Sequence, residues 1–215
     1  MLRSLPLLIL SPTRFIIDQW KRCQTSPTTR GQVLWRWNSF WFYIEVVECA
    51  ALVAITSQFD ELPTRAIWLS VLACYFAFSR AVEISYAFVR DISDRLADMN
   101  PASDLASNRR IVMAFRSYIG LASQFAVLFF FLPGLSALRF WGWSLPSDKA
   151  MSGDLKTFFD ALYFSVITIT TTGYGDIKPM MWPTRTLAMW EVLSGLLLIA
   201  VAFAIYLSPP SRRKE

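Results

Sequence analysis

The chain has 215 residues, of which 54% are hydrophobic and 15% aromatic, with a mean hydropathy of +0.39 and a formal net charge of +5. A soluble domain of this length fills its core with fewer apolar residues, so the composition indicates a membrane protein. The sequence has no histidine, which excludes imidazole metal sites and Ser-His or Cys-His nucleophile pairs. Its three cysteines lack the spacing of a disulfide framework or a metal site. We therefore expect neither an enzyme nor a bound cofactor.

The N-terminal segment, residues 1–39, is expected to lie on the cytoplasmic side of the membrane. The apolar run in its first ten residues is short and no small-residue cleavage site follows, so we expect the segment to be retained. Within residues 12–22, Phe15, Ile16 and Trp20 lie near one helical face, which suits a helix at the membrane surface. A flexible tail with a few apolar residues is an equal alternative.

Long apolar stretches dominate the rest of the chain. Four of them approach the roughly 20 residues that a helix needs to cross the hydrocarbon core: Phe40 to Ser57, Ala66 to Val89, Ile111 to Leu132, and Thr186 to Leu207. A fifth stretch, Phe158 to Ile169, is too short to span and is predicted to be a re-entrant half-helix. The predicted fold is an all-α membrane protein with four transmembrane helices and one re-entrant helix.

These stretches divide the chain into a peripheral part, residues 40–110, a second part, residues 111–207, and a short tail, residues 208–215. The N-terminal segment, the linker after the second span and the tail hold about twice as many Lys and Arg residues as the loops on the other side. We therefore expect both termini to be cytoplasmic in a cell-membrane protein. This topology accounts for the basic charge without a nucleic acid partner. Residues 91–99 of the linker could form a surface helix or a solvated connector.

Charged side chains inside the first two spans need partners, because ionisable groups are costly in hydrocarbon. Glu45 and Glu48 share one face of the first span, and Arg80 and Glu83 share one face of the second. An Arg80 salt bridge with a first-span acid would satisfy much of this charge. A voltage sensor needs several arginines at every third position, whereas the second span has only Arg80. We interpret the four residues as a structural charge cluster.

The stretch TITTTGYGDIKP, residues 168–179, follows the short apolar helix and precedes the last span. Irregular backbone at membrane depth is tolerated only where it is buried in protein or lines a water-filled path. Glycines at 173 and 175 permit backbone conformations closed to other residues, so successive carbonyls can point the same way. Several such strands around a symmetry axis would form oxygen rings that replace the hydration shell of a cation.

The residues TITTTGYGD resemble the selectivity-filter signature of potassium channels, Thr-x-x-Thr-x-Gly-Tyr-Gly. The stretch Ile111 to Leu207 is similar to the outer helix, pore helix, filter and inner helix of that family, in order. The match covers a little under half of the chain. The resemblance implies a homotetrameric, potassium-selective channel in a lipid bilayer, with passive conduction of K⁺ as the permeant ion and no cofactor. It leaves open whether a separate regulatory protein binds.

Carried over to this sequence, the resemblance assigns ion coordination to consecutive backbone carbonyls. Thr171, Thr172, Gly173 and Tyr174 would supply the oxygens, and the Thr171 hydroxyl would form the innermost ring. Gly175 would supply the outer bend. In the family, the ring at the position of Tyr174 packs outward against the pore helix and sets the filter diameter.

The residues around the filter follow the family less closely. Asp176 would lie at the outer mouth, where a ring of four acids concentrates cations, and Thr168 would hydrogen-bond within the end of the pore helix. Thr172 stands where the family most often has valine or isoleucine, so its hydroxyl needs a partner behind the filter. Ile167 stands where some members have a glutamate paired with the following aspartate. That glutamate is absent here, so the resemblance does not identify the group that stabilises Asp176.

The last predicted helix contains three features of interest. Gly195 lies where the family has its inner-helix hinge, and a hinge and simple close packing are equal alternatives. Phe203 and Leu207 share a face that could form a hydrophobic constriction, or could face lipid or neighbouring helices. Glu191 is costly in hydrocarbon, so we expect a structural hydrogen bond to the pore-helix region rather than direct ion binding.

Three other functions compete with a potassium channel. A non-conducting or weakly selective membrane subunit that keeps a pore-like fold is disfavoured by the intact Gly-Tyr-Gly-Asp sequence. A transporter with broken-helix repeats would need four pore loops or a tandem repeat, and the sequence has one pore loop. A membrane enzyme lacks a clustered polar catalytic set.

Overall fold

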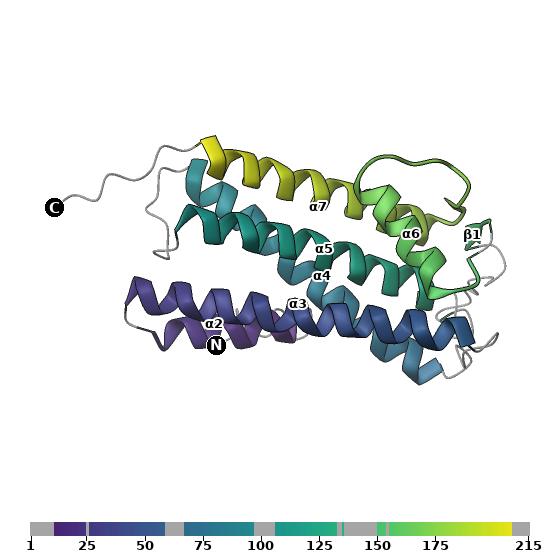
Figure 1. Ribbon diagram of the computed structural model, residues 1–215, viewed down its shortest axis with the longest axis horizontal. Coiled ribbons are helices and arrows are strands. Elements are labelled where there is room, and N and C mark those ends of the chain that lie inside the picture. Colours follow the sequence, from purple (N-terminus) through teal and green to yellow (C-terminus); the bar gives the residue numbers. More distant parts are fainter. Residues whose placement is uncertain are drawn as a thin grey trace.

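The computed structural model describes residues 11–24, 26–58, 67–96, 106–132, 135, 150–153 and 155–207. Six helices and two short strands make up most of this part of the chain. They are α2 (Pro12–Arg22), α3 (Pro27–Gln58), α4 (Ile67–Leu96), α5 (Ser107–Phe131), β1 (Met151–Ser152), α6 (Phe158–Ile169), β2 (Lys178–Pro179) and α7 (Trp182–Leu207). The long helices run roughly along one direction, and α6 lies beside α5 and α7 at one end (Figure 1). The predicted all-α fold is confirmed.

Three of the described helices are long and apolar enough to cross a membrane: α3 over Thr28–Gln58, α4 over Trp68–Asp91 and α5 over Asn108–Phe131. They confirm the first three predicted spans. Helix α7 has 26 residues, about 39 Å at 1.5 Å per residue, which exceeds a hydrocarbon core of about 30 Å. The side chains of its last turns lie outside the described residues, so the fourth crossing stays a prediction.

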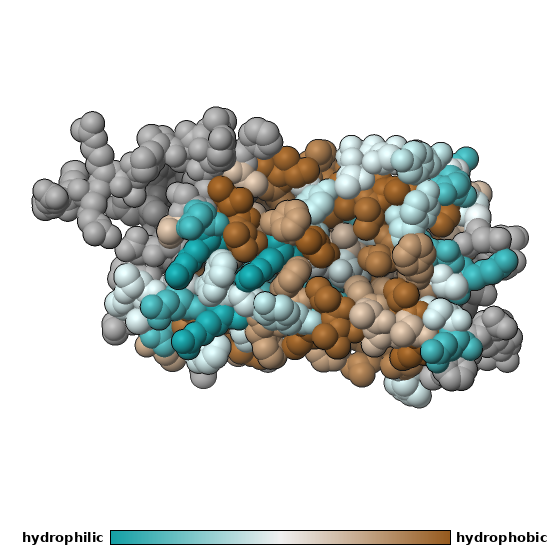
Figure 2. Space-filling model, in the orientation of Figure 1, coloured by the Kyte–Doolittle hydropathy of each residue, from teal (hydrophilic) through white to brown (hydrophobic). Residues whose placement is uncertain are grey.

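The boundaries of two helices differ from the prediction. Helix α3 begins at Pro27, well before the apolar segment, because polar residues continue its helix beyond the hydrophobic stretch. Helix α4 continues to Leu96, so residues 90–96 of the predicted linker extend the second span as a helix. Residues 97–99 lie outside the described residues. The short helix α6, by contrast, covers the predicted Phe158–Ile169. Apolar side chains cover much of the face in Figure 2, and hydrophilic side chains gather mainly toward its ends.

Helix α5 lies at the centre of the bundle and packs against α3, α4, α6 and α7. Its C-terminal half, residues 121–131, is buried along its whole length. Phe125 meets Trp190 of α7 edge to face at 5.1 Å between ring centroids, and Phe129 meets Phe164 of α6 at 4.8 Å. Edge-to-face aromatic pairs add about 0.5–1.5 kcal/mol each to the burial of their surface. This core therefore fixes α6 and α7 relative to α5.

Helix α2 packs against α3 and α4, so the helical alternative for residues 12–22 is confirmed. The Ser11 hydroxyl donates to the Ser79 carbonyl at 3.0 Å. The Arg14 guanidinium lies 3.5 Å from the ring centroid of Tyr86, a cation–π contact. Ile17 is buried against the bundle. The segment is thus docked on the peripheral helices.

A buried charge cluster joins α3 and α4 beside α5. Arg80 Nη2 lies 3.0 Å from Glu45 Oε1, and Arg80 Nη1 lies 2.6 Å from Glu83 Oε2. The Glu45 carboxylate packs directly against the backbone at Gly120 of α5, where a Cβ would clash with it. Glu48 lies apart from this cluster, with its Oε2 3.5 Å from Gln124 Nε2 of α5. The peripheral helices therefore contact α5 through a carboxylate that an arginine partly neutralises.

Candidate functional site

Helix α6 begins at a capping box. The Thr157 hydroxyl accepts from Asp160 N at 3.3 Å, and Asp160 Oδ2 accepts from Thr157 N at 2.7 Å. This reciprocal pair satisfies two of the donors that every helix leaves free at its first turn. Phe158 N also donates to the Thr56 hydroxyl of α3 at 3.1 Å. The start of α6 is therefore fixed both locally and to the peripheral helices.

The backbone of the motif follows α6 in residues 170–176, which we call the motif loop. The Ile167 carbonyl accepts from Thr172 N at 2.9 Å and from Gly173 N at 3.1 Å. Thr171 N donates to the Thr168 carbonyl at 2.9 Å, which places Thr168 at the end of the helix. The amides of the loop thus bond back to α6.

Positive φ angles let the motif loop turn back along α6. They are 58° at Thr171, 51° at Gly173 and 80° at Gly175. Glycine adopts such angles freely, whereas a threonine there is strained by about 1–3 kcal/mol. In the described part of the chain, the carbonyls of Thr171, Thr172, Gly173 and Tyr174 accept no hydrogen bond. The loop therefore presents four backbone oxygens that are free to bind another group.

The hydroxyl of Thr172 has a partner within the same loop. Thr170 Oγ1 lies 2.7 Å from the Val166 carbonyl and 3.0 Å from Thr172 Oγ1. A carbonyl only accepts, so Thr170 donates to Val166 and accepts the Thr172 proton. The valine-to-threonine difference from the family is thus accommodated by a neighbouring threonine.

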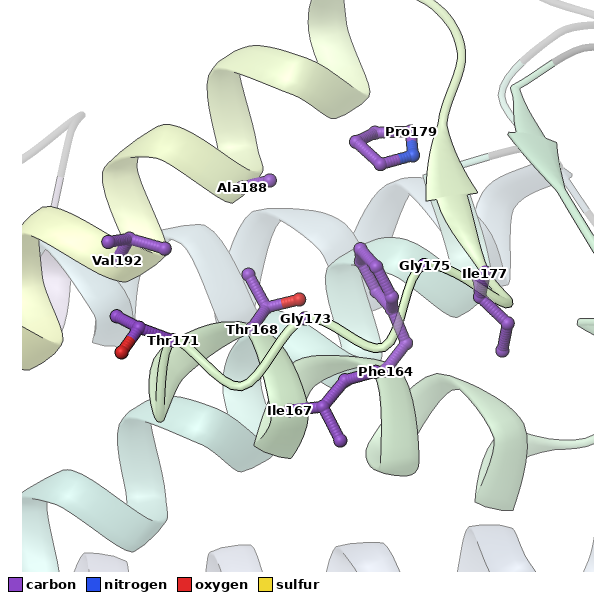
Figure 3. Close-up of a pocket in the computed structure, with 10 residues that line it drawn as sticks. All are labelled: Phe164, Ile167, Thr168, Thr171, Gly173, Gly175, Ile177, Pro179, Ala188 and Val192. Carbon is purple, nitrogen blue, oxygen red and sulfur yellow. The ribbon is translucent and has the colours of Figure 1, made fainter.

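Beside the motif loop is a cavity of about 250 Å³. Its walls come from α6, from the loop and from the first turns of α7, and include Phe164, Thr171, Ala188 and Val192. Figure 3 shows the loop running between α6 and α7, with the side chains of Ala188 and Val192 on the α7 side. The walls are mainly apolar, which suits packing against another apolar or aromatic side chain rather than binding of a bare ion.

Asp176 is held by Tyr163, a residue that the sequence analysis missed. The Tyr163 hydroxyl donates to Asp176 Oδ2 at 2.8 Å, and Ile177 N donates to Asp176 Oδ1 at 3.0 Å. The Tyr163 hydrogen bond is the main cause that lowers the pKa of Asp176 below its ordinary value. Tyr163 and Asp176 are 13 residues apart, and no periodicity in the sequence indicates that they meet.

A short antiparallel strand pair fixes the exit of the loop. Met151 pairs with Pro179, and Ser152 pairs with Lys178. The Ala150 carbonyl accepts from Met180 N at 3.1 Å and from the Thr184 hydroxyl at 3.0 Å. These contacts connect the segment before α6 to the beginning of α7, so both ends of the motif loop are anchored within this chain.

Helix α7 contacts α6 at two positions one turn apart. The buried Glu191 carboxyl contacts the Ser165 hydroxyl. A Cβ at Gly195 would lie 2.6 Å from Ile169 Cγ1, so only glycine permits this approach of the two helices. Close packing at Gly195 is therefore observed, whereas its role as a hinge stays a prediction.

Several apolar side chains near the motif loop are exposed in the single chain. Tyr174 is 72% exposed, so its ring is not buried within its own chain, and its packing against a pore helix stays a prediction. Leu196 and Ile199 of α7 are also exposed. Phe203 continues their face by helical spacing, and α7 runs through Phe203 and Leu207. The side chains of these last two residues lie outside the described residues.

Comparison with known proteins addresses this segment. Residues 117–209 match the family model described as "Ion channel". A probable potassium channel protein 2 of Methanocaldococcus jannaschii is 48% identical over 48 residues, 22% of this chain and 14% of the relative. The two-pore potassium channel 1 of Arabidopsis thaliana is 33% identical over 98 residues, 45% of this chain and 22% of the relative. No solved structure is a significant match.

A human voltage-gated potassium channel regulatory subunit is also similar, with 36% identity over 56 residues, 26% of this chain and 11% of the relative. The chain thus spans less than a quarter of the length of each of these relatives. Their class confirms the expectation that the chain is not an enzyme. The match and the long apolar helices together make it a multi-pass membrane protein. Residues 117–209, which include the motif loop, are thus similar to an ion channel family and to segments of potassium channels, and this similarity supports the predicted resemblance to the potassium channel pore family.

Proposed function

We propose that this chain is the subunit of a homotetrameric potassium channel that conducts K⁺ passively and selectively through the motif loop. The observation that carries the proposal is the set of four consecutive backbone oxygens, from Thr171 to Tyr174, that accept no hydrogen bond within the described residues. Carbonyl oxygens at a close spacing replace the hydration shell of K⁺. The family of residues 117–209 supports this use of the oxygens.

The proposed homotetramer is supported by the oxygen ring, which a single chain leaves incomplete. A single motif loop supplies one side of an oxygen ring, and a closed ring needs symmetry-related copies. Tyr174 and the Leu196 and Ile199 face of α7 are exposed apolar groups beside the loop, and adjacent subunits would cover them. The apolar cavity beside the loop leaves room for a side chain from such a neighbour.

Asp176 is proposed to form the outer ring of four carboxylates. Its low pKa keeps the side chain ionised, which concentrates cations at the pore mouth. Tyr163 takes the stabilising place that a glutamate at the position of Ile167 holds in some family members. On this proposal both termini are cytoplasmic, and Asp176 faces the outside.

The gate is proposed to lie on the exposed face of α7. Leu196 and Ile199 begin a line of apolar side chains that Phe203 and Leu207 continue by helical spacing. Four copies around the axis would make a hydrophobic constriction that closes by dewetting. Glu45, Arg80 and Glu83 form a compact pair network rather than a ladder of arginines, so we assign them a supporting role and no voltage-sensing role.

A flux experiment on purified protein tests the proposal. Liposomes containing the protein and a K⁺ gradient should release K⁺, and an equal Na⁺ gradient should give little flux. Gly173→Ala should abolish the K⁺ flux, because the φ of 51° at Gly173 favours glycine. Val47→Ala is the matched control, since Val47 is an exposed residue of α3 far from the motif in sequence.

The outcome also separates the channel from the runner-up, a non-conducting or weakly selective membrane subunit, a reading that the similarity to a human channel regulatory subunit favours. A non-conducting subunit would give no flux alone. Equal Na⁺ and K⁺ flux would contradict selectivity, and unchanged flux in Gly173→Ala would place the conduction path elsewhere. The mass of the particle in detergent should equal four chains, and any other number would contradict the tetramer.

A further inference from the structure

Glu191 is the most buried acid in the described part of the chain, and only half of its carboxyl has a partner. Its Oε1 contacts the Ser165 hydroxyl of α6, whereas its Oε2 is buried without a hydrogen bond. Neither Glu191 nor Ser165 has any measurable exposure in the subunit. Among the described residues, no Lys or Arg forms an ion pair with Glu191.

A count of protons decides the state of this carboxyl. The Ser165 hydroxyl has a single proton, and its oxygen lies 2.7 Å from the Ala122 carbonyl of α5. The Ala122 carbonyl can only accept, so the Ser165 proton must lie on that contact. The second contact of Ser165 Oγ, with Glu191 Oε1, then also needs a proton, and the only group that can supply it is the Glu191 carboxyl.

The ionised alternative leaves two costly groups. An ionised Glu191 could only accept a hydrogen bond, so the Ser165 hydroxyl would have to donate to it. The 2.7 Å contact between Ser165 Oγ and the Ala122 carbonyl would then join two oxygens without a hydrogen between them. Glu191 Oε2 would carry charge with no donor beside it. The titratable neighbour on α5 is Tyr118, and its hydroxyl already donates to the Ile169 carbonyl at 3.2 Å. A neutral Glu191 avoids the first cost and leaves Oε2 as an uncharged acceptor, which costs less to bury than a charged one.

The position of this contact relates it to the motif loop. Glu191 and Gly195 lie one turn apart on α7, and they meet Ser165 and Ile169, which lie one turn apart on α6. The contact with Ala122 brings α5 into the same junction. Ile169 is the last residue of α6, so this junction of three helices ends where the motif loop begins.

We propose that Glu191 is a neutral carboxylic acid that donates its proton to Ser165, and that this proton is a positioning element holding α6 against α5 and α7. The chain of donors runs from Glu191 to Ser165 to the Ala122 carbonyl. It fixes the base from which the motif loop starts. The effect on conduction rests on the proposed channel function, whereas the protonation of Glu191 does not.

Infrared spectroscopy of the purified protein tests the proton directly. The difference between wild type and Glu191→Gln should contain the carbonyl band of a protonated carboxylic acid. Ser165→Ala should shift that band to higher frequency, because the acid loses its hydrogen-bond acceptor. A difference spectrum with only carboxylate bands overturns the proposal, as does a band that Ser165→Ala leaves in place. This result does not depend on whether the protein conducts.

Flux measurements test the positioning role. Glu191→Leu removes the donor and should lower K⁺ flux by about tenfold, because Ser165 is left with an unpaired lone-pair site in the core. Glu191→Gln keeps a neutral donor and should restore flux to within about twofold of wild type. The double variant Glu191→Leu with Ser165→Ala should regain part of the loss, since both partners are then apolar.

A Glu191→Gln variant as impaired as Glu191→Leu overturns the positioning proposal, provided that both variants elute as the wild-type oligomer. A Glu191→Leu variant with wild-type flux overturns it as well. Absent flux in the wild type itself would contradict the proposed function, and the infrared bands would still decide the protonation of Glu191.

Discussion

The two halves of the bundle bury polar groups in different ways. In the peripheral half, Arg80 contacts two carboxylates, those of Glu45 and Glu83, at the interface of α3 and α4. In the half formed by α5, α6 and α7, the buried contacts run through hydroxyls, carbonyls and one carboxyl that forms no ion pair with a described Lys or Arg. The first arrangement depends on charge and the second on the directions of donors. Substitutions in the first half should therefore act through unpaired charge, and substitutions in the second half through lost or displaced hydrogen bonds.

The largest effect is expected from breaking the charge cluster. Arg80→Met leaves Glu45 and Glu83 buried without a cation, which should destabilise the protein by about 3–5 kcal/mol. The loss should appear in thermal unfolding and in the yield of intact oligomer. The K⁺ over Na⁺ preference of the protein that still folds should not change, because the cluster does not contact the motif loop in the described structure.

A triple variant is the control for this prediction. Arg80→Met together with Glu45→Gln and Glu83→Gln removes every charge of the cluster, and neutral replacements of a buried ion network are often nearly neutral for stability. Most of the stability should therefore return. If the triple variant is as unstable as Arg80→Met, the cluster stabilises through its packing and not through its charge.

The next effect concerns the contact of α7 with the end of α6. Gly195→Ala places a methyl group 2.6 Å from Ile169 Cγ1 and 3.1 Å from the Ile169 carbonyl. Overpacking of this kind costs about 1–3 kcal/mol, and it should reduce flux because it displaces the residue before the motif loop. Adding Ile169→Val should recover part of the loss. Wild-type flux and stability in Gly195→Ala would show that the two helices separate easily.

The motif region was largely predictable from sequence, because its signals are local. Glycines at a fixed spacing indicate positive φ angles, and the apolar stretch Phe158–Ile169 indicates a helix, which begins at its own capping box. The partners of these residues were harder to predict, because they come from distant parts of the chain. Hydrogen bonds of Tyr163, Ser165 and Ala122 join residues far apart in the sequence, and no sequence periodicity indicates them.

In the peripheral half, too, the sequence predicted which residues need partners but not which partners they have. The sequence identified Glu45, Glu48, Arg80 and Glu83 as groups that need partners, because each charge is costly at membrane depth. It could not show that Glu48 faces Gln124 of α5 instead of Arg80, since the choice depends on how α3 is rotated against its neighbours. The docking of α2 on α4 likewise depends on contacts across the fold, such as Ser11 with Ser79.

A smaller, pH-dependent effect is expected at the outer end of the loop. Tyr163→Phe removes the hydrogen bond that chiefly lowers the pKa of Asp176, so that pKa should rise toward its ordinary value. In the wild type the carboxylate contact is present above the ordinary pKa of an aspartate and is lost only as the pH falls through the lowered value. In the variant, Asp176 should become protonated at a higher pH than in the wild type.

The measurement is K⁺ flux as a function of the pH outside the liposomes. The acidic limb of the profile should move to higher pH in Tyr163→Phe, and flux at neutral pH should change little. Tyr43→Phe on α3 is the matched control, because it removes a phenolic hydroxyl from an exposed peripheral side chain. An unchanged acidic limb in Tyr163→Phe would show that protonation of Asp176 does not limit flux.

The smallest effect is expected from Thr172→Val, which introduces the side chain most often found in the family. The substitution removes the hydrogen bond from Thr172 to Thr170, a loss of about 0.5–1.5 kcal/mol per subunit. Thr170 still donates to the Val166 carbonyl at 2.7 Å, so no buried donor is left without a partner. Flux and K⁺ over Na⁺ preference should both stay close to those of the wild type. A large change in ion preference would instead mean that the Thr172 hydroxyl determines the geometry of the loop oxygens. The motif loop would then depend on a directed side-chain hydrogen bond, as the contacts between α5, α6 and α7 do.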